Sequence, residues 1–182
     1  MTHEIILSGF GGQGIMAMGK MLAEAGMQES LSVNWLPSYG PEVRGGTAYC
    51  SVLLSSEPIV SPLVQEPTEI IVMNKPSLLR FEPLLVKGGL AFINSSIVEI
   101  PASRRDIEAF YVPCLDIAQE LGNPRAANMV MLGAYIEVTQ CVRPQTVEKM
   151  LSHLFTGAKA NLVSLNKEAL RRGAASILKA AS

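Results

Sequence analysis

The sequence predicts an α/β domain in which a mainly parallel β-sheet lies between layers of helices, with a helical C-terminal half. Three observations predict this fold class. Short runs of β-forming residues alternate with segments of helical periodicity. A glycine-rich turn separates the first strand-like run from the first helix-like one. Residues 1–182 contain no linker, internal repeat or low-complexity tract, so we expect one three-layer domain over the whole chain.

Each expected strand is a short apolar or β-branched run bounded by turn-forming residues. The third, for example, is rich in β-formers and is bounded by Gly46 and Pro58. Because helices alternate with most of the strands, the sheet is expected to be mainly parallel. The expected strands are 4–8, 32–36, 47–55, 70–73, 90–94 and 107–112.

The expected helices show apolar residues at intervals of three and four, or begin at a recognisable starting residue. Asn74 is a plausible cap for the second helix, and Asn123 caps the start of another at Pro124. The helices are expected over 13–30, 74–85, 115–121 and 124–140, with two more that start at Pro144 and at Asn166, the latter as a cap.

The segment 124–140 is apolar on almost every side. Met129, Leu132 and Ile136 lie on one helical face, and Val130 and Ala134 lie on another. A helix of this kind has to be buried on both sides, either by its own domain or by another subunit.

The composition predicts a surface that is partly covered. Charged residues make up 17% of the chain, against roughly 25% in ordinary soluble domains. We therefore expect a permanent protein partner, and self-association of the isolated chain. The net charge of −1 argues against nucleic acid as a partner. No apolar run reaches the ~20 residues needed to cross a bilayer, so no membrane partner is expected.

The cysteine and histidine content does not predict a metal site. Cys50, Cys114 and Cys141 are far apart and form no C-x-x-C pair, so iron–sulfur and zinc ligation from neighbouring residues is excluded. We expect three core cysteines in a reducing cytoplasm. His3 and His153 lie beside no candidate nucleophile, and we expect no catalytic residue in this chain.

The first glycine-rich turn, Gly9–Gly14, has the G-x-G-x-x-G spacing of a Rossmann-like strand-to-helix turn. Dinucleotide binding also requires an acidic residue at the end of the second strand, and 33–37 contains none. Two interpretations remain open. The glycines serve close packing only, or the backbone N–H groups at the helix N-terminus hold a phosphate or a partner's carboxylate.

The second glycine-rich loop, 39–46, combines rigid Pro41 with flexible glycines and a charged pair, Glu42 and Arg44. Arg44 is flanked closely by glycines and can reach out as a bidentate donor to phosphate or carboxylate, although a local ion pair with Glu42 is the alternative. Both loops follow strands, so they are expected to lie together at the carboxyl edge of the sheet.

Three segments resemble the gamma subunit, or gamma-type module, of 2-oxoacid:ferredoxin oxidoreductases, including the pyruvate:ferredoxin enzymes. They are Gly9–Ile15 (GFGGQGI), Ser38–Ala48 (SYGPEVRGGTA) and Ala126–Ala134 (AANMVMLGA). The second is the most specific and is most similar to the 2-oxoglutarate and 2-oxoisovalerate types. The resemblance covers essentially the whole chain.

The resemblance implies a subunit that is inactive alone, within a complex that converts a 2-oxoacid to acyl-CoA and CO2. It implies alpha and beta (thiamine-binding) subunits, a ferredoxin-like delta subunit and ferredoxin as partners. Thiamine diphosphate, Mg, iron–sulfur clusters and CoA are expected in the complex, with none held firmly by this chain. The candidate residues for a CoA phosphate or a subunit contact are Gly9, Gly11, Gly12, Gln13, Gly14, Tyr39, Gly40, Pro41, Glu42, Arg44, Gly45, Gly46 and Asn128.

Two other classes of function compete with this interpretation. One is a stand-alone nucleotide-binding Rossmann-like domain, which the missing acidic residue disfavours. The other is a scaffold without a ligand, whose glycine loops only allow close packing.

Overall fold

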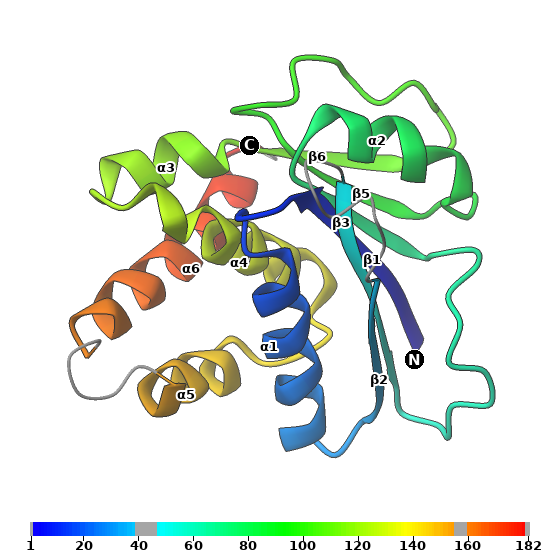
Figure 1. Ribbon diagram of the computed structural model, residues 1–182, viewed down its shortest axis with the longest axis horizontal. Coiled ribbons are helices and arrows are strands. Elements are labelled where there is room, and N and C mark those ends of the chain that lie inside the picture. The colour runs from blue at the N-terminus through cyan, green and yellow to red at the C-terminus, as the bar shows by residue number, and fades with distance from the viewer. Residues whose placement is uncertain (1, 39–46, 155–159, 181–182) are drawn as a thin grey trace.

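The computed structural model describes residues 2–38, 47–154 and 160–180, which form a β-sheet flanked by helices on both faces (Figure 1). The strands are β1 (Thr2–Phe10), β2 (Ser32–Pro37), β3 (Thr47–Ser55), β4 (Glu69–Val72), β5 (Leu90–Asn94) and β6 (Glu108–Val112). The α-helices are α1 (Ile15–Gln28), α2 (Lys75–Phe81), α3 (Cys114–Glu120), α4 (Ala127–Thr139), α5 (Pro144–Leu154) and α6 (Asn161–Ala180). Two 3-10 helices are η2 (Glu82–Leu84) and η3 (Pro124–Ala126).

The strands lie in the order β2-β3-β1-β4-β5-β6. β1, β4, β5 and β6 are parallel neighbours, whereas β3 runs antiparallel to both β1 and β2. The prediction of a mainly parallel sheet is confirmed, and every expected strand is present with its ends shifted by two residues at most.

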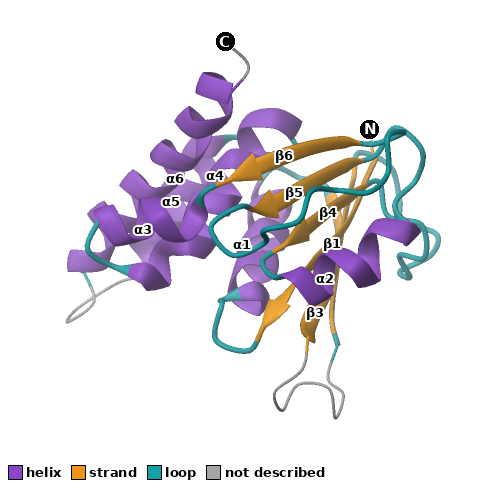
Figure 2. Cartoon of the chain, turned by 90° about the horizontal axis from the view of Figure 1, so that it is seen from above, coloured by secondary structure: helices purple, strands orange, loops and turns teal. Residues whose placement is uncertain are grey.

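The two faces of the sheet are buried by different layers. Helices α1, α3, α4, α5 and α6 lie on one side and α2 on the other, as both views show (Figures 1 and 2). Consecutive residues of β1 enter different cores: Ile5 and Leu7 pack with the larger helical layer, and Ile6 packs with Leu78 and Phe81 on the α2 side. This alternation follows from the two-residue period of a strand.

Helix α4 lies at the centre of the larger layer. Val130, Leu132, Ala134 and Tyr135 have no exposed surface, and α4 contacts α3, α5, α6 and β5. The expectation that this helix is buried on both sides is confirmed, and its own domain provides the cover.

Two glycines allow α4 and α6 to cross closely. A β-carbon at Gly133 would collide with the backbone carbonyl of Leu170, and one at Gly173 would collide with that of Val130. Each glycine therefore faces the other helix's backbone directly, and no side-chain movement can make room.

The helix starts are confirmed with one exception. Asn74 accepts a hydrogen bond from the Ser77 N–H at 2.8 Å and caps α2, and Asn123 accepts one from the Arg125 N–H at 3.1 Å. Asn166 was expected to cap the last helix, and this is wrong because α6 already begins at Asn161. The Asn166 side chain lies inside the helix and donates back to the Leu162 carbonyl at 2.9 Å, which is the alternative bond open to a buried asparagine.

Among the described residues, no helix combines the length and the apolar character needed to cross a membrane.

The helix crossing gives a stability prediction. Gly133→Ala or Gly173→Ala is expected to lower the free energy of unfolding by about 3 kcal/mol, because the new methyl group meets rigid backbone. Thermal unfolding should show a melting temperature lower by about 6–12 °C for a chain of this size. Ser164→Ala, on the exposed side of α6, is the control and should leave the melting temperature within about 2 °C. Unchanged melting of both glycine variants would contradict the described crossing.

Candidate functional site at the carboxyl edge of the sheet

The turn between β1 and α1 is held by the side chain of Gln13. Its Oε1 accepts a hydrogen bond from the Phe10 N–H at 2.7 Å, and its Nε2 donates to the Met73 carbonyl at 3.1 Å. Gly9 makes room for this bridge, since a β-carbon there would lie 2.6 Å from Gln13 Oε1 and 3.0 Å from Met73 Cβ. Gln13 thus ties the turn to the residue that follows β4.

The glycines of this turn have conformations that side chains disfavour. Gly12 and Gly14 have φ angles of 92° and 75°, in the left-handed region. Gly14 is the N-cap residue of α1, and no side chain caps the helix. The first turn of α1 contains no acidic residue. The backbone N–H groups of this helix start are therefore available to an anion, as the phosphate-binding interpretation requires.

Asn128 brings the start of α4 to the same turn. Its Nδ2 donates to the Gly14 carbonyl at 3.4 Å, and a β-carbon at Gly14 would collide with this side-chain amide. The structure therefore brings Asn128 together with the first glycine turn, although 114 residues separate it from Gly14 in the sequence.

A cavity of about 170 Å³ opens beside the turn. A neighbouring hollow of about 430 Å³ lies between α1, α4 and α6 and is lined by Asn128 and Asn166. Arg125 lines both spaces, and its exposed side chain has no ion pair with a described residue. The smaller cavity is lined by Gly12, Gln13, Met73, Asn94, Ile97, Leu115, Pro124, Arg125 and Ala127.

Asn94, the last residue of β5, adds a buried amide to the cavity lining. It has no exposed surface, its Oδ1 accepts from the Ser96 N–H at 3.3 Å, and its Nδ2 has no partner among the described residues. Sequence reasoning missed Asn94 and Arg125. The position of Asn94 at the end of an expected strand could have predicted its place at the site. No local sequence pattern indicated Arg125.

Seven of the candidate residues lie in the second glycine-rich loop. These residues, Tyr39, Gly40, Pro41, Glu42, Arg44, Gly45 and Gly46, lie outside the described part of the chain. The strand residue that follows them, Thr47, pairs with Phe10 at the end of β1. The chain therefore enters β3 at the same sheet edge as the first glycine turn.

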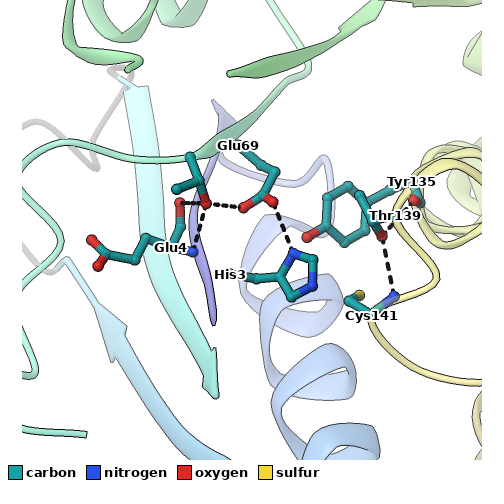
Figure 3. Close-up of polar contacts among 7 residues, drawn as sticks. His3, Glu4, Glu69, Tyr135, Thr139 and Cys141 are labelled. Carbon is teal, nitrogen blue, oxygen red and sulfur yellow. Dashed lines mark hydrogen bonds and ion pairs between the residues drawn. The ribbon is translucent and has the colours of Figure 1, made fainter. Parts of the chain in front are cut away.

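A buried polar cluster lies at the opposite, amino edge of the sheet (Figure 3). His3 Nδ1 donates to Glu69 Oε1 at 2.8 Å, and the second carboxylate oxygen of Glu69 accepts from the Thr68 hydroxyl. The Tyr135 hydroxyl points toward this pair from α4 (Figure 3). His3 and Glu69 are both buried, so the ion pair links the starts of β1 and β4 within the core.

Two further ionisable groups near this pair, Tyr135 and Cys141, are held in their neutral forms at neutral pH. Burial raises the pKa of the Cys141 thiol to about 11, and burial, with Cys141 and Glu69 nearby, raises the pKa of Tyr135 well above its usual value. Burial likewise raises the pKa of Cys50 to about 11. The expectation of three free core cysteines is confirmed, and at neutral pH these thiols are poor nucleophiles.

The described residues thus place two different arrangements at the two edges of the sheet. The amino edge holds a closed, buried ion pair. The carboxyl edge offers uncapped backbone N–H groups, the Asn94 amide and the Arg125 guanidinium, which are all hydrogen-bond donors. Donors without a general base suit binding of an anionic group better than covalent chemistry.

Comparison with known proteins shows one family. The family model described as pyruvate ferredoxin/flavodoxin oxidoreductase matches residues 4–176. A ketoisovalerate oxidoreductase subunit VorA from Methanothermobacter thermautotrophicus is 36% identical over 172 residues, which cover 94% of this chain and 35% of the relative. The chain thus spans about a third of the length of this relative.

Two further proteins match over most of both chains. A 2-oxoglutarate synthase subunit KorC from Methanocaldococcus jannaschii is 33% identical over 154 residues, which cover 83% of this chain and 82% of the relative. The crystal structure of a keto/oxoacid ferredoxin oxidoreductase gamma subunit from Geobacter sulfurreducens has a TM-score of 0.83 at 25% identity and covers 97% of this chain and 99% of that one.

The amino-edge ion pair gives a second stability prediction. Glu69→Ala is expected to cost about 3 kcal/mol of unfolding free energy, because the buried His3 and Thr68 lose their partner. Thermal unfolding should show a drop of about 6–12 °C in melting temperature. Glu99→Ala, which removes an exposed carboxylate, should change it by less than about 2 °C. Equal melting temperatures for the two variants would show that the buried pair contributes nothing.

Proposed function

This chain belongs to the pyruvate ferredoxin/flavodoxin oxidoreductase family, and we propose that it serves as the gamma subunit of a multi-subunit 2-oxoacid:ferredoxin oxidoreductase. The observation that carries the proposal is its match to KorC, which extends over four-fifths of both chains at 33% identity. The names of the relatives suggest 2-oxoglutarate or the branched-chain ketoisovalerate as substrate.

In this proposal the chemistry of the 2-oxoacid takes place on companion subunits. Alpha and beta subunits would bind thiamine diphosphate and Mg, and a ferredoxin-like subunit would pass electrons to ferredoxin. The complex is proposed to act in the cytoplasm.

We further propose that the carboxyl edge of the sheet positions CoA through one of its phosphates. Two features support this role, since both favour a phosphate group: the start of α1 without a side-chain cap, and Arg125, which has no ion pair with a described residue. Arg44 and the rest of the second glycine-rich loop would approach the same ligand.

A stand-alone dinucleotide-binding function fits the topology poorly. In a dinucleotide-binding sheet the second strand lies beside the first and supplies the acidic residue that binds the ribose. Here β3 separates β2 from β1, and β2 ends in Leu36 and Pro37 without a carboxylate. The acidic residue that would bind the ribose is therefore missing at the end of β2.

Co-purification tests the subunit role. We expect the tagged chain, expressed in its native cells, to retain thiamine-binding and ferredoxin-like companions that mass spectrometry identifies. The purified assembly should reduce a viologen dye with a 2-oxoacid and CoA, whereas the isolated chain should not. Turnover by the isolated chain, or recovery without companions, would contradict the proposal.

Arg125 provides the test of CoA positioning. In the assembled enzyme, Arg125→Ala should raise KM for CoA by about tenfold, because a charge-assisted hydrogen bond to phosphate is lost, and leave kcat within about twofold. The control is Arg105→Ala, which removes an exposed arginine just before β6 at the amino edge. An identical KM in the two variants would rule out a contact between Arg125 and CoA.

Arg44 gives a parallel test on the second loop. Arg44→Ala is expected to raise the apparent KM for CoA while CO2 release from the 2-oxoacid, measured without CoA, stays intact. Unchanged CoA dependence would favour the scaffold interpretation of this loop.

A further inference from the structure

The connection between β3 and β4 carries two strongly exposed apolar side chains, one of which, Val60, is the most exposed large apolar side chain of the described residues. Val60 is 99% exposed and Leu63 is 61% exposed. The segment 58–65 (PIVSPLVQ) contains no charged residue, and exposed carboxylates, Glu57 and Glu66, flank it. Single exposed apolar residues are common on protein surfaces, but two in one uncharged segment, both largely exposed, indicate a contact surface.

The segment is fixed to the domain by Val64 and by the residues that follow it. Val64 packs into the α2-side core with Leu78 and Phe81. The Pro67 carbonyl accepts a hydrogen bond from the Val86 N–H at 3.0 Å. Leu63, next to Val64, is exposed instead. The exposed side chains are thus presented by an anchored segment.

Two further exposed leucines lie on the same side of the sheet. Leu79 on α2 is 58% exposed and Leu84 on η2 is 44% exposed. Leu84 lines one hollow together with Gln65 and Glu66 at the end of the segment. Segment and α2 lie on the same side of the sheet, away from α4, α5 and α6 (Figures 1 and 2). We call Val60, Leu63, Leu79 and Leu84 the α2-side apolar surface.

The lengths of the relatives indicate the kind of partner that this domain contacts. The same domain makes up about a third of VorA but about four-fifths of KorC. Part of the family therefore carries a further two-thirds of polypeptide on the same chain, and part of it exists as a chain of this size. Contacts made within the longer chain must be made between subunits in the shorter one.

We propose that the α2-side apolar surface is the docking site for a companion subunit equivalent to the remaining two-thirds of VorA. The matching surface on that subunit is an apolar groove that receives Val60 and Leu63, with basic groups at its ends for Glu57 and Glu66. This inference rests on the proposed role of the chain as a subunit, and it adds the face and the side chains that make the contact.

The test uses the tagged chain co-expressed with its companion subunits. The double variant Val60→Asp/Leu63→Asp should retain at least tenfold less companion subunit than the unaltered chain, measured by native mass spectrometry of the eluate. Met27→Asp is the matched control, because Met27 is 66% exposed on α1, on the other side of the sheet. The control should retain the companion fully, and both variants should melt at the temperature of the unaltered chain.

Each other outcome overturns a specific part of the inference. Full retention by the double variant, with companions bound to the unaltered chain, removes the docking site and leaves the subunit role standing. An unaltered chain that binds no companion removes the subunit role itself. A double variant that loses only a second copy of this chain identifies the surface as a self-association site and overturns the proposed occupant. Equal losses in the double variant and in Met27→Asp would show that the effect is not specific to this face.

Discussion

The bridge that Gln13 makes between the ends of β1 and β4 fixes the carboxyl edge on which the proposed function depends. It sets the turn by accepting from Phe10 and donating to Met73, and it requires a residue without a side chain at Gly9. Once the turn is fixed, α1 starts without a side-chain cap, and Gly12 and Gln13 of the turn line the cavity together with Arg125. The proposed phosphate contact thus follows from one side-chain amide and the glycines around it.

Helix α4 connects this edge with the rest of the domain. Its first turn contributes Asn128, which contacts Gly14 at the carboxyl edge, and its later turns contribute Tyr135 and Thr139 to the cluster at the amino edge. The crossing with α6 at Gly133 fixes the helix position between these ends. The residues of α4 from Asn128 to Ile136 are all buried, so a shift of the helix would disturb both edges.

Local sequence patterns were sufficient to predict the strands, most helix starts and the first glycine turn. Strand periodicity, helix caps and glycine spacing are all determined by residues that lie close together in the sequence. They were insufficient where the outcome depends on tertiary contacts. The cap expected at Asn166 failed because the same side chain can bond back to Leu162 inside a helix. The ion pair of His3 with Glu69 spans 66 residues, and the position of Arg125 depends on how η3 packs. No local pattern contains that information.

The central claim is that the carboxyl edge of this chain faces CoA inside a larger enzyme. A cryo-electron microscopy structure of the purified complex with CoA tests it most directly. The account predicts a CoA phosphate within hydrogen-bond distance of the backbone N–H groups at Gly12–Ile15 and of the Arg125 guanidinium. CoA held entirely by companion subunits, with this edge occupied by protein side chains alone, would contradict it.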